Sequence, residues 1–212
     1  MKKKPQGGLE GSWLGRLMQT RLVVLLSNWV FQCMRYMNIY ELTVKLSLDV
    51  VIAGVLLAFV WSETSLLSVL YSILIAHTLN WLINGHFFVL MRYVYPFPTK
   101  VERFHSFADE MKARGERFRF IQGLALYGSY CRDKLHEGSD LDVRVIVNPG
   151  PLNGFMGALY CLWERFKAFL AGFPLDIYCC SGTACLDKLR DDEIPVVLID
   201  RQGDLARKYG LS

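Results

Sequence analysis

The chain has 212 residues, of which 52% are hydrophobic and 21% are charged, and its formal net charge is +4. Soluble domains contain about 45–50% apolar and about 25% charged residues, so the composition excludes a disordered chain, a charged tail protein and a fibrous repeat. Residues 1–99 hold eight Lys or Arg and four acids, whereas residues 100–212 hold sixteen of each sign. We therefore expect the apolar, basic first half to meet an anionic membrane, and we expect no nucleic-acid partner.

Residues 1–40 have the pattern of an amphipathic helix that lies in the membrane interface. Arg16 and Arg21 are interspersed with apolar side chains at helical spacing, and Trp13 and Trp29 are suited to anchor such a helix. The apolar positions are Leu14, Leu17, Met18, Leu22, Leu25 and Leu26. Packing of this segment on neighbouring helices is an equally good interpretation.

Residues 41–95 are predicted to form a transmembrane hairpin of two helices. Residues 50–61 and 66–83 contain no Asp, Glu, Lys or Arg, and each segment, extended to its polar end, approaches the roughly 20 residues needed to cross a bilayer. Lys45 and Arg92 flank the pair, while the short connection holds Glu63 and no base. The positive-inside rule then predicts a two-span protein of the cell membrane with both termini in the cytoplasm. The alternative is a buried hairpin in a soluble protein.

Two further features of the hairpin have functional and structural interpretations. His77, Asn80, Asn84 and His86 form a polar stripe, which we expect to bond to neighbouring groups rather than to mark a pathway. Gly54 and Ala58 have a small-residue spacing that would suit a homo-oligomer formed through the hairpin.

The remaining residues predict a linker and one α/β domain. Prolines at 96 and 98 end the hairpin, and residues 96–118 form a linker with a charged helix. Residues 119–212 then alternate between strand and helix patterns. We expect strands at 120–127, 141–147, 174–179 and 195–200, with helices at 129–136, 152–171 and 183–190.

Six cysteines are present, without a CxxC pair. We expect reduced thiols, as in a cytosolic domain. The alternative is a zinc site formed by Cys179, Cys180 and Cys185 with His136.

Acidic residues on two of the predicted strands suggest metal chemistry. Asp140, Asp142 and Arg144 are spaced by two and therefore share one face of a strand. Neighbouring carboxylates repel each other, and a Mg²⁺ ion held together with substrate phosphates relieves that repulsion. Asp176 is an acid within another apolar strand, and Gly128 precedes an expected helix whose N-terminus suits a phosphate.

The run LYGSYCRDKLHEGSDLDVRVIV resembles the signature of the polymerase β-type nucleotidyltransferases, in which Gly-Ser is followed by an Asp-x-Asp pair and a later acid. The resemblance covers roughly residues 119–200 and implies a minimal α/β (α+β) nucleotidyltransferase-type mixed sheet with flanking helices, preceded here by the transmembrane hairpin. It implies transfer of a nucleoside monophosphate from an NTP of unknown base, with two Mg²⁺ ions, or Mn²⁺, as cofactors.

The same resemblance implies roles for particular residues. Asp140 and Asp142 would bind the two metal ions, and Asp176 would hold one of them and accept a proton. The remaining candidates would bind the nucleotide phosphates: Gly128, Ser129, Arg132, Lys134 and Arg144. For Arg144, a salt bridge to Asp140 or Asp142 is an equal alternative.

The membrane hairpin suggests the acceptor, because a tethered active site meets membrane components at high effective concentration. We expect a lipid phosphate, a lipid-linked glycan or a membrane protein. The alternative is a catalytically silent module, a nucleotide-binding regulator or antitoxin-like protein that binds a membrane or protein partner.

Overall fold

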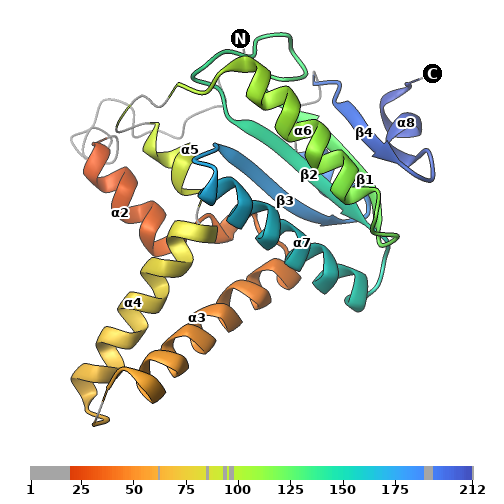
Figure 1. The fold of residues 1–212 in the computed structure, drawn as a ribbon. Coiled ribbons are helices and arrows are strands. Elements are labelled where there is room, and N and C mark those ends of the chain that lie inside the picture. The colour runs from red at the N-terminus through yellow and green to blue at the C-terminus, as the bar shows by residue number, and fades with distance from the viewer. Residues whose placement is uncertain are drawn as a thin grey trace, which may run out of the picture.

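The computed structural model describes residues 20–61, 63–84, 86–92, 95, 98–188 and 193–211. Helices form the first part of this chain, and a sheet with covering helices forms the second (Figure 1). The helical elements are α2 (Arg21–Phe31), the short helix η1 (Met34–Tyr36), α3 (Ile39–Phe59), α4 (Leu66–Asn84) and α5 (Phe87–Met91). The part of the expected interfacial helix before residue 20, with Trp13, lies outside the described residues.

Helices α3 and α4 form a hairpin that projects away from the sheet (Figure 1). Both are long and apolar enough to cross a membrane. Their apolar side chains are largely exposed, including Val50 and Phe59, which are 72% and 85% exposed. A hairpin buried in a soluble core would hide such side chains, so the exposed surface disfavours the soluble alternative.

Helix α2 packs against α4. The Trp29 indole N–H donates to Thr78 Oγ1 at 3.2 Å, and the Trp81 indole N–H donates to Asn28 Oδ1 at 2.7 Å. The His77 ring nitrogen Nε2 lies 2.9 Å from the Trp29 carbonyl oxygen. The interpretation of this segment as a helix packed on the hairpin is therefore confirmed for the described residues.

The polar stripe on α4 bonds to neighbouring protein groups, as expected. His77 Nδ1 lies 3.6 Å from Asp49 Oδ2, and the Asn80 amide donates to Asp49 Oδ1 at 2.8 Å and to the Lys45 carbonyl at 2.9 Å. These contacts join α4 to α3. They satisfy polar groups that would otherwise be costly in an apolar environment.

The second part contains a mixed four-stranded sheet in the order β3-β2-β1-β4. Its strands are β1 (Ile121–Tyr127), β2 (Leu141–Val147), β3 (Leu175–Ser181) and β4 (Val196–Asp200). Strand β1 is antiparallel to both β2 and β4, whereas β2 and β3 are parallel. The parallel pair is connected through α7 (Pro151–Leu170), as a parallel crossover requires. The other elements are α6 (Val101–Gly115), η2 (Thr183–Lys188) and α8 (Asp204–Tyr209).

Helices α6 and α7 cover one face of this sheet (Figure 1). The core on that face includes Phe104 and Met111 of α6, Cys161 of α7, and Val143 and Val145 of β2. A smaller cluster forms on the opposite face, between the sheet, η2 and α8. The alternation expected for residues 141–147 is confirmed as far as residue 145, because Leu141, Val143 and Val145 are buried while Asp142 and Arg144 are half-buried. It ends at Ile146, which is buried in the smaller cluster on the opposite face.

Two expectations about local structure are wrong. Residues 128–133 form turns rather than the expected helix at 129–136, because the Ser and Asp side chains and the glycine backbone of this segment favour turns over helix. The expectation of reduced thiols fails at one pair, since Cys180 and Cys185 form a disulfide. That bond removes two thiols from the zinc alternative, and the His136 ring nitrogen Nδ1 accepts a hydrogen bond from Gly138 N.

Candidate active site

Three carboxylates meet where the parallel strands β2 and β3 begin. Asp142 and Asp176 are direct partners in the parallel register, and Asp140 lies just before β2. The end of β1 reaches the same place, because Tyr127 pairs with Asp142. The structure therefore brings together the three acids that the sequence predicted and places the Gly128-Ser129 turn beside them.

Burial and mutual repulsion dominate the electrostatics of these acids. Burial raises the pKa of Asp142, and the nearby carboxylates of Asp140 and Asp176 raise it further. Burial and the charge of Asp176 raise the pKa of Asp140 as well. A bound cation would relieve this repulsion, because positive charge near a carboxylate favours its ionised form.

Gly128 creates the space that the Asp142 carboxylate occupies. A Cβ atom at position 128 would lie 2.0 Å from Asp142 Oδ2, which no real structure tolerates. The backbone at Gly128 also has φ +68°, a conformation that favours glycine. Both facts make glycine necessary at this position.

Ser129 carries a hydroxyl without a protein partner. Among the described residues, its Oγ atom is buried and makes no hydrogen bond. A buried hydroxyl of this kind is costly unless a ligand or water satisfies it. Since no helix follows Ser129, any phosphate contact here would come from this hydroxyl and the turn, and not from a helix N-terminus.

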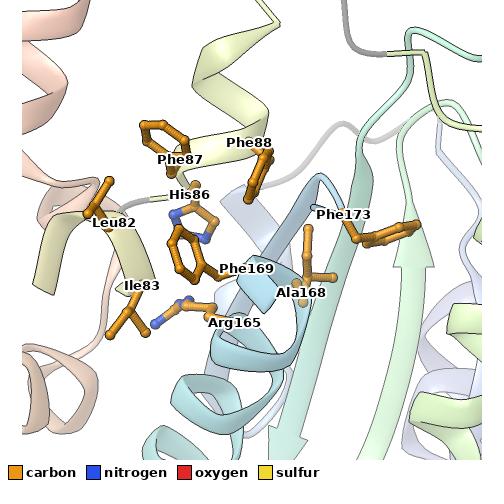
Figure 2. Close-up of a pocket in the computed structure, with 10 residues that line it drawn as sticks. Leu82, Ile83, His86, Phe87, Phe88, Arg165, Ala168, Phe169 and Phe173 are labelled. Atoms are coloured by element: carbon orange, nitrogen blue, oxygen red, sulfur yellow. The ribbon is translucent and has the colours of Figure 1, made fainter. Parts of the chain in front are cut away.

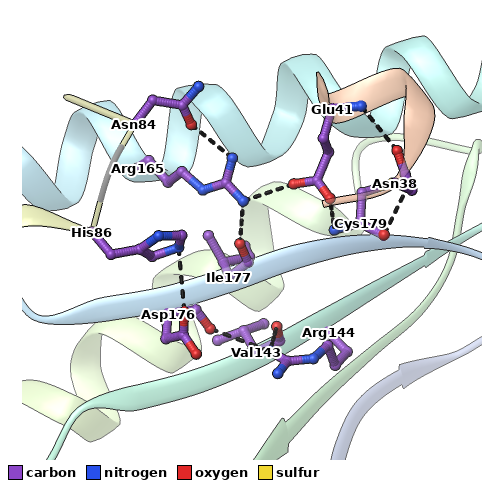
Figure 3. Close-up of polar contacts among 10 residues, drawn as sticks. All are labelled: Asn38, Glu41, Asn84, His86, Val143, Arg144, Arg165, Asp176, Ile177 and Cys179. Carbon is purple, nitrogen blue, oxygen red and sulfur yellow. Dashed lines mark hydrogen bonds and ion pairs between the residues drawn. The ribbon is translucent and has the colours of Figure 1, made fainter. Parts of the chain in front are cut away.

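The three basic side chains proposed to bind phosphate differ in their contacts and exposure. Arg144 lies over the Tyr178 ring, with its guanidinium carbon 4.9 Å from the ring centroid, and donates to the Val143 carbonyl at 2.8 Å (Figure 3). Within the described part of the chain, it forms no salt bridge with Asp140 or Asp142, so that alternative is wrong. Arg132 is half-exposed and ion-paired with Glu193 at 3.0 Å. Lys134 is exposed.

Two site residues were missed by the sequence analysis. His86 Nε2 lies 3.3 Å from Asp176 Oδ1 (Figure 3), and burial lowers the pKa of His86 to about 4. Arg92 lies near Asp140, where its positive charge partly offsets the rise in the pKa of Asp140 that burial and Asp176 cause. The sequence holds no signal for either contact, because both residues follow the apolar hairpin and are far along the chain from the acids.

The surroundings of His86 are closely packed. Figure 2 shows it among apolar side chains of α4, α5 and α7, including Leu82, Phe87 and Phe169. The space that they leave is about 10 Å³, which is enough for about one water molecule. His86 also lines a larger cavity of about 320 Å³, together with Asp176 and Arg144.

Strand β3, which carries Asp176, is an edge strand of the sheet. The backbone groups on the free edge of β3 bond to side chains at the base of the hairpin (Figure 3). Cys179 N donates to Glu41 Oε2 at 3.0 Å, and the Asn38 amide donates to the Cys179 carbonyl at 2.9 Å. Arg165 of α7 donates to the Ile177 carbonyl. The hairpin therefore covers an edge that would otherwise be open for pairing.

Arg165 joins the hairpin, α7 and β3 in one buried network. It donates to Glu41 Oε1 at 2.7 Å and to Asn84 Oδ1 at 2.7 Å. Glu41 lies in the first turn of α3, and Asn84 is the last residue of α4. Both ends of the hairpin are thus attached to the sheet domain, on the side where the three acids lie.

A mixed sheet with carboxylates on two neighbouring parallel strands, and a Gly-Ser turn beside them, fits a nucleotidyltransferase fold. Residues 106–200 match the family model described as a nucleotidyltransferase domain. A search of curated proteins found no match to the chain.

Proposed function

We propose that this protein is a membrane-anchored, divalent-metal-dependent nucleotidyltransferase that transfers a nucleoside monophosphate from an NTP to a membrane-associated acceptor. The observation that carries the proposal is the meeting of Asp140, Asp142 and Asp176 beside the Gly128 turn. Oxygen ligands of this kind suit Mg²⁺, and also Mn²⁺.

The three acids offer the oxygen ligands that a divalent cation prefers. In the described ranges, no group of three or more His, Cys, Asp or Glu side chains is arranged to hold a metal ion as it stands. However, Asp142 and Asp176 are register partners on the parallel strands, and the charges of Asp140 and Asp176 raise the pKa of Asp142. Such an array needs positive charge, and we propose that Asp140 and Asp142 hold the metal ions while Asp176 completes the set. When bound, the ions neutralise phosphate charge and activate the attacking oxygen.

The phosphates of the NTP would meet the turn that follows β1. The free Ser129 hydroxyl can donate to a phosphate oxygen, and Gly128 lets the backbone approach. Arg144 and Lys134 would add positive charge, and Arg92 is a further candidate because it lies beside Asp140. Arg132 would first have to leave Glu193.

Transfer then needs one bond to form and one to break. An acceptor oxygen bonds to the α-phosphorus, the bond between the α-phosphorus and the bridging oxygen breaks, and pyrophosphate leaves. Asp176 would accept the proton when the acceptor is a hydroxyl. Pre-positioned charge, rather than covalent catalysis, provides most of the rate in such reactions.

The hairpin supports a membrane location. Both of its ends contact the sheet domain through Arg165, so the connection at residue 63 is at the far end. We propose that α3 and α4 cross the membrane with the sheet domain in the cytoplasm, where NTPs are present. The acceptor would then be a lipid phosphate, a lipid-linked glycan or a membrane protein.

Label transfer tests the proposal. Full-length protein in detergent is incubated with each α-labelled NTP, Mg²⁺ and a membrane extract. We expect label in a membrane component and release of pyrophosphate, both of which Asp142→Asn should abolish. Absence of label and pyrophosphate with all four NTPs would overturn the proposal. A biological effect that survives Asp142→Asn would favour the silent regulatory module instead.

A further inference from the structure

The cavity beside Asp176 is built by both parts of the molecule. Asp176, Arg144 and Tyr178 of the sheet form one side of the 320 Å³ space. Tyr36 of η1 and Leu90 of α5 contribute to the other side. Volumes of about 300–1,000 Å³ are typical of small-molecule sites. The helical part therefore supplies an enclosing wall that the sheet lacks by itself.

This cavity continues along α2. A second hollow of about 520 Å³ shares Asn28, Cys33, Tyr36 and Leu90 with the first. Its further lining consists mainly of Val24, Ser27, Phe31 and Arg35. Asp176 and Arg144 supply charged groups at one end of this space. The lining along α2 combines apolar Val24 and Phe31 with polar Ser27 and Asn28, and Arg35 adds a positive charge there. We call the two hollows together the acceptor groove.

Two arginines line this groove. Arg144 is at the catalytic end and forms no salt bridge among the described residues, while Arg35 is exposed at the α2 end. An anionic head group would be attracted to these positive charges. An apolar chain would be favoured by Val24, Phe31 and Leu90.

From the two arginines of this groove, and from its position between Asp176 and the apolar side chains of α2, we infer that the acceptor groove binds a membrane lipid with a phosphate monoester head group, and that this lipid is the acceptor of the proposed nucleotidyl transfer. The inference rests on the proposed function. The groove is lined by Val24 and Phe31 of α2, which packs on the hairpin, and Phe31 is exposed. A lipid can therefore reach the groove from the bilayer with its chain on α2 and its head toward Asp176.

The chemistry balances with this acceptor. A phosphate monoester has a second pKa of about 6, so it is mostly dianionic near pH 7. One of its oxygens forms a bond to the α-phosphorus of the NTP, and pyrophosphate leaves as the bond to the bridging oxygen breaks. No proton has to be removed. The product is a lipid joined to the nucleoside through a diphosphate.

Crosslinking can detect the lipid independently of activity. Full-length protein is placed in phosphatidylcholine nanodiscs that contain phosphatidic acid with a photoactivatable group on its acyl chain. We expect the crosslinks to map to α2 and α5. Unlabelled phosphatidic acid should compete, whereas inorganic phosphate and diacylglycerol should not. Competition by inorganic phosphate would point to a free-phosphate site and overturn the inference, as would crosslinks confined to α3 and α4.

A matched pair of substitutions locates the site. Phe31 and Leu22 are both 65% exposed on α2, but only Phe31 lines the groove. We expect Phe31→Glu to weaken phosphatidic acid binding about tenfold, because one apolar contact is lost and a like charge is added. Leu22→Glu should change it by less than about twofold. Equal losses in both variants would overturn the inference.

The same samples distinguish a failure of the lipid inference from a failure of the proposed nucleotidyl transfer. With α-labelled NTP and Mg²⁺, label should enter phosphatidic acid. Label in a protein or glycan, without crosslinking of phosphatidic acid in the groove, would leave nucleotidyl transfer intact and overturn the lipid acceptor. Crosslinking in the groove without label in any membrane component would overturn both nucleotidyl transfer and the acceptor role of the lipid.

Discussion

At Gly128 a single hydrogen atom leaves room for the carboxylate of Asp142. Any larger residue would place a carbon 2.0 Å from Oδ2. The acid could then keep its position only if the backbone moved. The turn and the acid must therefore be considered as one unit, although fourteen positions separate them in the chain.

We expect Gly128→Ala to abolish nucleotidyl transfer by displacing Asp142. Gly182→Ala is the matched control, because Gly182 has φ +80° but no atom within 4 Å of an added Cβ. Both variants bear backbone strain of about 1–2 kcal/mol, and only the first should lose activity. Label transfer and thermal unfolding measure the two effects. Equal activity losses would show that strain, and not the contact with Asp142, matters.

Asp142 links metal binding to stability. Its pKa is raised from the ordinary value of 3.8, so the protonated form favours folding and this stabilisation is lost as the pH rises. In EDTA we expect Asp142→Asn to melt at a higher temperature than the wild type, increasingly so toward neutral pH. Mg²⁺ should raise the melting temperature of the wild type and leave the variant unchanged. No response of the wild type to Mg²⁺ would contradict a metal site here.

At the scale of elements, α3 has two roles in our proposal. Its first turn bonds to the sheet domain, and the rest of the helix crosses the membrane. Glu41, in its first turn, is 2% exposed and bonds to both Arg165 and Cys179. These bonds hold strand β3, which carries Asp176. The hairpin therefore helps to position the site, beyond anchoring it.

Removal of the Glu41 carboxylate should strongly destabilise the folded protein. We expect Glu41→Ala to destabilise the protein by about 3–5 kcal/mol, because it leaves the Arg165 charge buried and unpaired by its main partner. The control is Glu110→Ala, which breaks an exposed ion pair with Arg114 and should cost less than about 1 kcal/mol. Denaturant unfolding in detergent compares them. Similar losses would mean that the Glu41 pair is not essential to the fold.

At the scale of the molecule, Figure 1 shows that α3 and α4 converge at the end of the hairpin that is far from the sheet. Both ends of the hairpin bond to Arg165. A membrane crossing would therefore place the connection on one side and the sheet domain on the other.

Thiol labelling in intact cells tests this topology. We expect Glu63→Cys to react with a membrane-impermeant reagent, because its position would be extracellular. Glu116→Cys, at an exposed position after α6, should react only after lysis, and the wild type provides the background of native cysteines. Protection of Glu63→Cys in intact cells and its labelling after lysis would indicate a soluble or inverted protein.

The sequence by itself predicted the elements and the types of residue at the site. Alternation along β2 separated Asp142 and Arg144 from the core residues, and the apolar lengths of α3 and α4 indicated possible spans, because both are local patterns of side chains. It failed at residues 128–133 and at the Cys180–Cys185 disulfide, where short-range turn chemistry and pairing decide the outcome.

Only the tertiary structure decided which residues meet. Arg165 and Glu41 are 124 positions apart. His86, which lies between α4 and α5, contacts Asp176 of β3. The acceptor groove likewise joins α2 and α5 to the sheet. Such contacts depend on how the hairpin folds back onto the edge of β3, and no periodic pattern in the chain encodes that arrangement.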